Sequence, residues 1–266
     1  MDLQLDGLRA VVTGSSGGIG EQIARRLAAE GASVVVHGRR AEAVRAVAEA
    51  IKSSGGQAAG TVADLANPHD CARFIADTLA DGGPVSVLVN NAGAFVNRGW
   101  DQATPEDWLE LYAVNVAAVV RLIHGFLPAM RAAGFGRIIQ IGTGEAINPF
   151  ATMPDYAASK AALLNLTVSL SKHLARSGVT VNTVSPGIIV TPGVREFYRK
   201  EAARRGWPDD WAGIEARILA EILDNPVGRL GRPDEVSALV ALVASPLAGY
   251  INGANFRIDG GSTAVI

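Results

Sequence analysis

Short apolar runs and longer amphipathic segments alternate along the whole chain. The apolar runs are rich in Val and Ile, which favours buried strands, and the segments between them have the spacing of helices that bury one face. Strands are predicted at residues 8–13, 32–37, 57–62, 85–89, 136–141, 179–184 and 255–259. This alternation is typical of an α/β protein with one doubly wound parallel sheet of about seven strands and right-handed crossovers.

Several helices have clear start signals. Pro68, Thr104-Pro105 and Pro233 stand where a first helical residue or a cap is expected. Helices are therefore predicted at 68–80, from 104 through Asn115, and at 233–244, with another from Tyr156 to about Arg176.

Residues 188–230 are a long stretch without strand character. They hold aromatic residues and a charged helical patch, and the chain shows neither an internal repeat nor a linker. We predict a single domain over residues 1–266, in which a variable segment at about 188–230 binds substrate and its aromatics form part of a lid.

Composition excludes several classes of protein. Of 266 residues, 48% are hydrophobic and 19% charged, and the net charge is -2, which predicts a folded protein without the basic face that nucleic-acid binding needs. The single cysteine, Cys71, rules out an intramolecular disulfide and a cysteine-built metal cluster, and no metal is expected. We see neither a secretory signal nor an apolar run of membrane-spanning length, so a cytoplasmic protein without membrane contact is the expectation.

A glycine-rich turn joins the first strand to the first helix. Gly14, Gly18 and Gly20 follow the strand directly, with Ser15, Ser16 and Ile19 between them. Strand, glycine loop and helix together aim backbone N–H groups and a helix N-terminus at a phosphate. This spacing is weak alone, but its place after the first strand favours a cofactor site over a plain linker.

The end of the second strand bears on which dinucleotide would bind. An acidic residue there would accept hydrogen bonds from the adenine ribose of NAD, but the chain has Gly38 followed by Arg39. Without a carboxylate to repel a 2′-phosphate, and with a guanidinium to bind it, NADP(H) is favoured over NAD(H). The alternative is that Arg39 and Arg40 simply solvate a loop.

Tyr156 and Lys160 lie four residues apart, on one face of a predicted helix. A neighbouring ammonium lowers the pKa of a phenol, so the pair could exchange a proton with a substrate oxygen. Asn115 stands among Val and Ala on another predicted helix and needs hydrogen-bond partners there, so a structural amide is the alternative to a functional one.

Five features in one order resemble the short-chain dehydrogenase/reductase family, the single-domain Rossmann oxidoreductases. They are Thr13-Gly14-x3-Gly18-x-Gly20, Asn90-Asn91-Ala92-Gly93, Asn115, Tyr156-x3-Lys160 and Pro186-Gly187. The resemblance covers essentially the whole chain, and the C-terminal half looks most like the branch of the 3-oxoacyl-[acyl-carrier-protein] reductases.

The resemblance implies a role for each matching residue. Tyr156 would be the general acid/base, Lys160 would hold the nicotinamide ribose and depress the pKa of Tyr156, and Asn115 would support a water in a proton relay. Cofactor contacts are implied at Gly14, Ser15, Ser16, Gly18, Ile19, Gly20, Arg39, Asp64, Leu65, Asn91, Ala92, Gly93, Tyr156, Lys160, Pro186, Gly187, Ile189 and Thr191.

One residue departs from the family pattern. Thr143 stands thirteen residues before Tyr156, where the family usually has serine. Its hydroxyl can still bind a substrate oxygen, while its methyl group narrows the pocket. Glu145, two residues further, either faces the pocket or is solvated.

The leading hypothesis is an NADP(H)-dependent reductase that converts a ketone to a secondary alcohol with Tyr156 as the acid. The alternatives are an NAD-dependent dehydrogenase of a secondary alcohol, sugar or steroid, and a non-catalytic scaffold or sensor. The resemblance further implies a homotetramer or homodimer through the Asn115 and Tyr156 helices. Basic residues in the variable segment either dock an acidic partner or form a solvated helix face: Arg195, Arg199, Lys200, Arg204 and Arg205.

Overall fold

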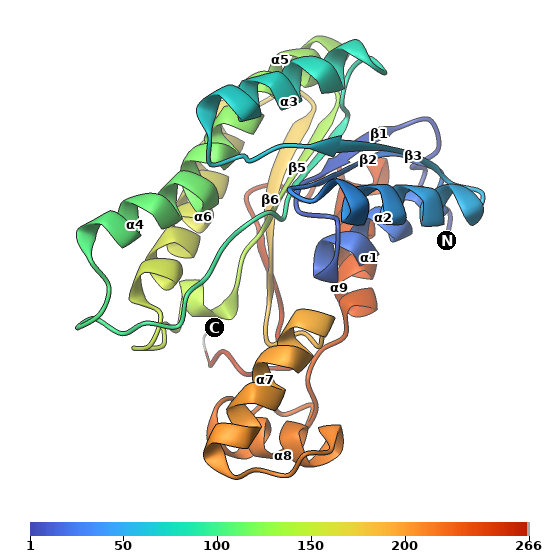
Figure 1. Ribbon diagram of the computed structural model, residues 1–266. Coiled ribbons are helices and arrows are strands. Elements are labelled where there is room, and N and C mark those ends of the chain that lie inside the picture. Colours follow the sequence, from blue (N-terminus) through green and yellow to red (C-terminus); the bar gives the residue numbers. More distant parts are fainter. Residues whose placement is uncertain (265–266) are drawn as a thin grey trace.

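The computed structural model describes residues 1–264, and its centre is one parallel sheet (Figure 1). Seven strands lie in the order β3-β2-β1-β4-β5-β6-β7, so the predicted doubly wound α/β fold is confirmed. The strands are β1 (Arg9–Val12), β2 (Ser33–Gly38), β3 (Gln57–Val62), β4 (Val87–Asn90), β5 (Gly136–Ile141), β6 (Val179–Pro186) and β7 (Asn255–Ile258). The order reverses between β1 and β4, and a crevice at the carboxyl ends of these strands is where such sheets bind ligands.

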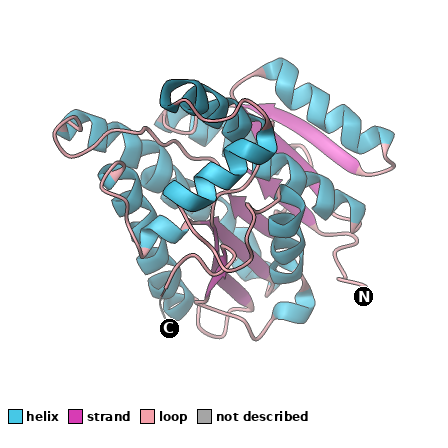
Figure 2. Cartoon of the chain, turned by 90° about the horizontal axis from the view of Figure 1, so that it is seen from below, coloured by secondary structure: helices cyan, strands magenta, loops and turns pink. Residues whose placement is uncertain are grey.

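Helices cover both faces of the sheet (Figure 2). They are α1 (Gly18–Ala29), α2 (Ala41–Ser53), α3 (Pro68–Ala80), α4 (Pro105–Tyr112), α5 (Ala118–Ala133), α6 (Pro154–His173), α7 (Pro192–Arg205), α8 (Trp211–Glu221) and α9 (Pro233–Ala244). Alternate strand residues face opposite layers, so Val12 packs with α1, α2 and α9, whereas Val11 packs with α3, α5 and α6.

The helical run from Pro105 to Ala133 is continuous, because a π-helical turn at Ala113–Ala117 joins α4 to α5. It is the one helix among residues 1–264 that is long and apolar enough to cross a membrane, with a mean hydropathy of 1.5. The expectation that no apolar run reaches this length was therefore wrong. Packing explains much of this apolar character, since α5 lies against α3, β4 and β5.

The segment after β6 forms a small unit of its own below the strand ends (Figure 1). Helices α7 and α8 bury Tyr198, Ala202, Ile214 and Ile218 together with Leu230, in a cluster separate from the two layers that flank the sheet. The predicted absence of strands from residues 188–230 is confirmed.

Candidate active site

Tyr156, Lys160, Thr143 and Asn115 converge at the carboxyl ends of β4 and β5. Tyr156 and Lys160 lie in the first turns of α6, with the lysine Nζ 5.9 Å from the centroid of the tyrosine ring. Lys160 is buried and its Nζ donates a hydrogen bond of 2.8 Å to the carbonyl oxygen of Ile141, the last residue of β5. Thr143 follows that strand by two residues, and its hydroxyl is close enough to stabilise the Tyr156 phenolate.

The pKa of Tyr156 is raised above its ordinary value, chiefly because the phenol is buried and also because the Glu145 carboxylate is near. The Thr143 hydroxyl offsets only part of this rise. Burial in turn lowers the pKa of Lys160 to about 8. The expected lowering of the Tyr156 pKa by Lys160 is thus contradicted for the protein alone, since the ammonium is directed at the Ile141 carbonyl instead.

Asn115 lies in the π-helical turn, a feature that often marks functional sites. Its side chain is buried and fully engaged: Oδ1 accepts from the Ala94 N–H at 2.9 Å, and Nδ2 donates to the Ala94 carbonyl and to Ser159 Oγ, each at 3.0 Å. Ser159 Oγ itself donates to the Tyr156 carbonyl oxygen at 2.7 Å. Asn115 thus ties the loop after β4 to the helix of Tyr156, as the structural interpretation of its amide predicted.

An ion cluster that sequence reasoning missed anchors the start of α6. Asp155 is fully buried, and its Oδ2 accepts from Arg98 Nη2 at 2.7 Å, while Arg98 Nη1 pairs with Asp107 of α4 at 2.6 Å. Asp155 Oδ1 also accepts from the Tyr156 N–H at 2.9 Å. Arg98 therefore fixes the loop after β4, α4 and the backbone of Tyr156 relative to one another. Its only sequence signal was an acid at the first turn of α6, without a partner at helical spacing.

The glycine loop has the geometry of an anion site. Helix α1 begins at Gly18, and its N-cap, Gly17, provides no side-chain hydrogen bond to the first-turn N–H groups. A Cβ on Gly17 would meet nothing within 4 Å, and one on Gly18 would meet only Thr191, at 3.6 Å. Open space thus lies before free N–H groups and the positive end of a helix dipole, which fits the pyrophosphate of a dinucleotide.

Other predicted contact residues hold this loop in place. Asn91 Nδ2 donates to the carbonyl oxygens of Thr13 and Gly14, at 2.9 and 3.2 Å, while the N–H groups of Asn91 and Ala92 donate to Thr13 Oγ1. Both amide hydrogens of Asn91 are spent inside the protein, so this side chain supports the loop after β1. Gly93 lies next to the side chains of Asn115 and Lys160, since a Cβ on this residue would be 3.1 Å from Asn115 Oδ1 and 3.5 Å from Lys160 Nζ.

The end of β2 has no room for an acidic side chain. A Cβ on Gly38 would clash with the side chain of Ser16, so the serine of the glycine loop occupies that place. Arg39 follows Gly38 and is exposed. Of the two residues after β3 that were predicted to flank the adenine, Asp64 is exposed and Leu65 is buried.

His37 is a buried connector that the sequence analysis did not single out. Its Nδ1 accepts from the Gly14 N–H at 3.0 Å, so its Nε2 carries the proton and donates to the Ala63 carbonyl oxygen at 3.2 Å. Burial is the main reason why the pKa of His37 is lowered to about 4. A neutral histidine therefore joins the glycine loop to the ends of β2 and β3.

The loop after β6 faces the glycine loop. Pro186 ends β6, the Gly187 N–H donates to the Ile258 carbonyl oxygen, and Ile189 pairs with Gly231. Thr191 caps α7 and approaches the Gly18 position. Two groups of residues predicted to hold a dinucleotide, the glycine loop and the loop after β6, thus come together at Gly18 and Thr191.

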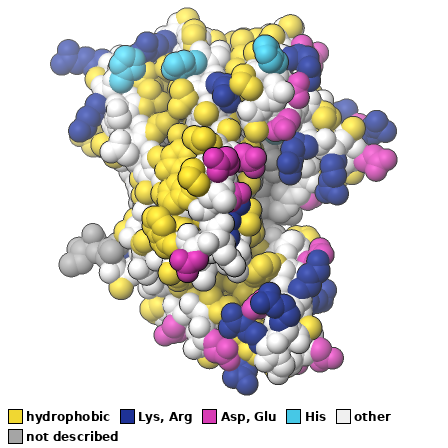
Figure 3. Space-filling model, turned by 60° about the vertical axis from the view of Figure 1, so that its left-hand side comes forward, with side chains coloured by type: hydrophobic (Ala, Val, Ile, Leu, Met, Phe, Trp, Pro, Cys, Tyr) yellow, Lys and Arg dark blue, Asp and Glu magenta, His cyan; other side chains and the backbone are white. Residues whose placement is uncertain are grey.

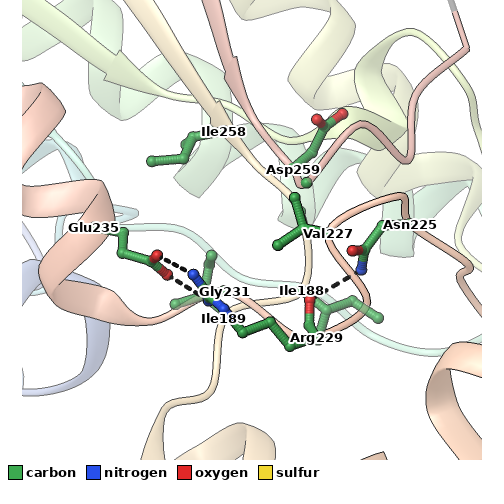
Figure 4. Close-up of a pocket in the computed structure, with 11 residues that line it drawn as sticks. Ile188, Ile189, Asn225, Val227, Arg229, Gly231, Glu235, Ile258 and Asp259 are labelled. Atoms are coloured by element: carbon green, nitrogen blue, oxygen red, sulfur yellow. Dashed lines mark hydrogen bonds and ion pairs between the residues drawn. The ribbon is translucent and has the colours of Figure 1, made fainter. Parts of the chain in front are cut away.

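Two cavities lie at the loop after β6, and both are lined in part by the variable segment. The smaller, about 70 Å³, lies beside Thr143 and Glu145 and is closed on one side by Ile188 and Leu223. The larger, about 190 Å³, lies between the loop after β6 and the end of β7 (Figure 4). Arg229 and Glu235 form an ion pair in the wall of the larger cavity, and none of the predicted catalytic residues lines it. Thr143 lines the smaller cavity, which is therefore the candidate site for the substrate.

The basic residues of α7 mostly face acids of their own helix. Lys200 pairs with Glu196 at 2.7 Å, and both Arg204 and Arg205 pair with Glu201. Arg195 lies over the ring of Trp211, at 4.2 Å from its centroid. These contacts favour the solvated helix face over a docking surface for an acidic partner.

Comparison with known proteins agrees with this geometry. Residues 9–202 match the short chain dehydrogenase family. The chain is 32% identical over 259 residues to the 3-oxoacyl-[acyl-carrier-protein] reductase FabG of Escherichia coli, covering 97% of this chain and 98% of that one. Among solved structures, L-sorbose reductase from Gluconobacter frateurii, complexed with NADPH and L-sorbose, superimposes with a TM-score of 0.95 at 31% identity over the full length of both chains. A gluconate 5-dehydrogenase from Burkholderia cenocepacia, in complex with NADP and tartrate, has a TM-score of 0.85 at 32% identity, covering 100% of this chain and 98% of that one. The chain belongs to the short-chain dehydrogenase family, as its ordered motifs predicted.

Proposed function

We propose that this short-chain dehydrogenase uses NADP(H) to reduce a small ketone to a secondary alcohol, with Tyr156 as the general acid. The observation that carries the proposal is the half-buried Tyr156, whose phenol lies beside the Thr143 hydroxyl at the carboxyl end of β5. A phenol with a raised pKa keeps its proton at neutral pH, and a protonated phenol is the form that can donate to a carbonyl oxygen.

The bound nicotinamide would supply the hydride, and the residues around it would bind and orient the reactants. The N–H groups at the start of α1 bind pyrophosphate, and Lys160, buried beside Tyr156, binds the nicotinamide ribose hydroxyls. The Thr143 hydroxyl donates to the substrate oxygen and polarises the carbonyl. Asn115 fixes the loop after β4, and the water relay that family resemblance implies for it remains part of this proposal.

The preference for NADP(H) rests on the end of β2. Ser16 fills the place where a ribose-binding carboxylate would stand, and Arg39 is exposed next to it. A serine hydroxyl and a guanidinium both suit a 2′-phosphate. That two similar solved structures hold NADPH or NADP supports this preference.

Two variants test the proposal. Tyr156→Phe is expected to abolish NADPH consumption with a panel of ketones while leaving NADPH binding, measured by fluorescence titration, within about twofold. Full turnover by this variant would remove Tyr156 from the mechanism. Arg39→Ala is expected to raise the Kd for NADPH about tenfold and to leave that for NADH unchanged, as the loss of one charge-assisted contact predicts.

The alternatives give different results. A dehydrogenase of secondary alcohols, sugars or steroids that uses NAD would bind NADH at least as tightly as NADPH, and then Arg39 only solvates its loop. A non-catalytic scaffold would consume no cofactor with any carbonyl compound. The intact set of Tyr156, Lys160 and Asn115 supports an enzyme over a scaffold.

We further propose that two copies of the chain pair through α4, α5 and α6. Figure 3 shows a broad apolar area on the face that carries these helices. Two apolar side chains of these helices are exposed, Leu109 of α4 at 72% and Val168 of α6 at 43%. A second patch around Leu247 and Tyr250 supports pairing of such dimers into a tetramer. Light scattering tests this: a monomer at micromolar concentration would refute it.

A further inference from the structure

We propose that Glu145 is a substrate-binding residue that selects ketones carrying a hydroxyl group near the carbonyl, such as uncharged ketoses and other hydroxyketones. This inference rests on the proposed reductase function and narrows its substrate class. It depends on a carboxylate oxygen that the protein itself leaves without a partner beside the catalytic threonine.

The backbone holds Glu145 next to Thr143, while one oxygen of its side chain has no partner within residues 1–264. It lies in the short 3-10 turn Gly144–Ala146 between β5 and α6, and its N–H donates to Thr143 Oγ1 at 3.3 Å. Among the described residues, its Oε2 has no hydrogen-bond partner, although this atom is buried. A buried carboxylate oxygen without a donor is costly, so a donor from a bound molecule would stabilise this arrangement.

The same side chain lines the smaller cavity and faces the reacting groups. Its charge contributes to the raised pKa of Tyr156 and to that of Tyr198 on α7, which reaches about 12. The carboxyl group therefore lies within electrostatic reach of the catalytic phenol on one side and of the variable segment on the other. A substrate whose carbonyl oxygen meets Thr143 and Tyr156 would place its neighbouring atoms next to Glu145.

The lining of the cavity indicates what those atoms should be. Besides Thr143 and Glu145 it presents Asn148, Ser262 and Thr263, which are neutral hydrogen-bonding groups, and none of the described residues that line it is basic. A substrate carboxylate or phosphate would find no counter-charge there, whereas hydroxyl groups would find both donors and acceptors. Burial raises the pKa of Glu145 to about 7, so the group can accept from a hydroxyl when ionised and donate to one when protonated.

The test compares two ketones that differ by one hydroxyl group, 3-hydroxy-2-butanone and 2-butanone. For each, kcat/KM with NADPH is measured for the wild type, Glu145→Gln and Glu145→Ala, with Glu49→Gln, an exposed acid on α2, as the control. We expect the preference for the hydroxyketone to fall about tenfold in the Gln variant and about 100-fold in the Ala variant, as for lost hydrogen bonds to a charged group. The control should keep the wild-type ratio. An unchanged ratio in Glu145→Ala would overturn the inference.

A binding measurement separates this inference from the proposed function. Calorimetric titration of xylitol into the protein with NADPH forms a complex that cannot react. Tighter binding to the wild type than to Glu145→Ala supports the hydroxyl site, and equal binding, or no binding to either, overturns it. If the wild type consumes NADPH with neither of these ketones nor with any other of the panel, the proposed reductase fails, and the titration still decides the role of Glu145.

Discussion

His37 should make the stability of the protein depend on pH in a way that one substitution removes. The pKa of this buried side chain is about 4 in the folded protein, compared with 6.5 for an ordinary histidine. Nδ1 accepts from the Gly14 N–H and Nε2 donates to the Ala63 carbonyl oxygen. A second proton would therefore sit on Nδ1 and point at the N–H of Gly14, so that two donors would face each other. The unfolded chain binds the proton more readily, so the stability that neutral His37 contributes is complete above pH 6.5 and is lost as the pH falls toward 4.

The size of the effect follows from the two pKa values. A tenfold difference in proton affinity corresponds to about 1.4 kcal/mol, so full protonation costs about 3 kcal/mol. Between pH 7.5 and pH 5, linkage gives a loss of about 2 kcal/mol in the free energy of unfolding. Glu145, whose pKa is raised to about 7, contributes with the opposite sign over the same range. The wild-type curve alone therefore mixes the two contributions.

The assay is urea unfolding of the wild type and of His37→Gln from pH 7.5 to pH 5, at one protein concentration so that association is constant. Glutamine does not titrate, and the Glu145 contribution cancels in the difference between the two proteins. We expect the variant to be less stable at pH 7.5 and the gap to narrow by about 2 kcal/mol at pH 5. Parallel curves would refute the assigned tautomer and its coupling to the glycine loop.

Three further substitutions test the packing around the site. Arg98→Met leaves Asp155 buried without its cation, so the free energy of unfolding should fall by about 3 kcal/mol in urea, and an unchanged midpoint would contradict the ion cluster. The side-chain amide of Gln140 is buried without a partner among the described residues, so Gln140→Leu should keep or raise Tm, and a fall would show that the amide is satisfied after all. Gly38→Ala should cost about 1–3 kcal/mol through its contact with Ser16, and adding Ser16→Gly should recover part of this loss in the same assay.

Much of the fold could be predicted because buried parallel strands are almost wholly apolar and their helices have clear starts. β3, α3, β5 and α9 begin and end at the predicted residues. β4 begins at Val87 rather than Val85, since its register pairs it with Ala10 of β1, and a register depends on the partner strand. α6 ends at His173 and not near Arg176, whose φ of 62° is left-handed without a glycine to signal it.

The candidate site was predictable where its chemistry has fixed spacing along the chain. Tyr156 and Lys160 share a helix face, and their positions follow from the helical repeat. Arg98 and Asp155 are 57 residues apart, so no local pattern links them. The pKa of Tyr156 depends on how deeply the phenol is buried and on the direction of the Lys160 ammonium, which are properties of the packed protein.

The small core beneath α7 and α8 has a consequence for how this protein can diverge. Tyr198, Ile214 and Ile218 pack with one another rather than with the sheet, and Ile188, which lines both cavities, packs against their cluster. Substitutions among the three can therefore move a wall of the cavities and leave the two main layers undisturbed. Changes of selectivity that arise within this segment thus need not disturb the packing of the sheet. Related chains can therefore acquire new substrates through substitutions within the about forty residues of the variable segment, while the sheet and the helices on its two faces stay unchanged.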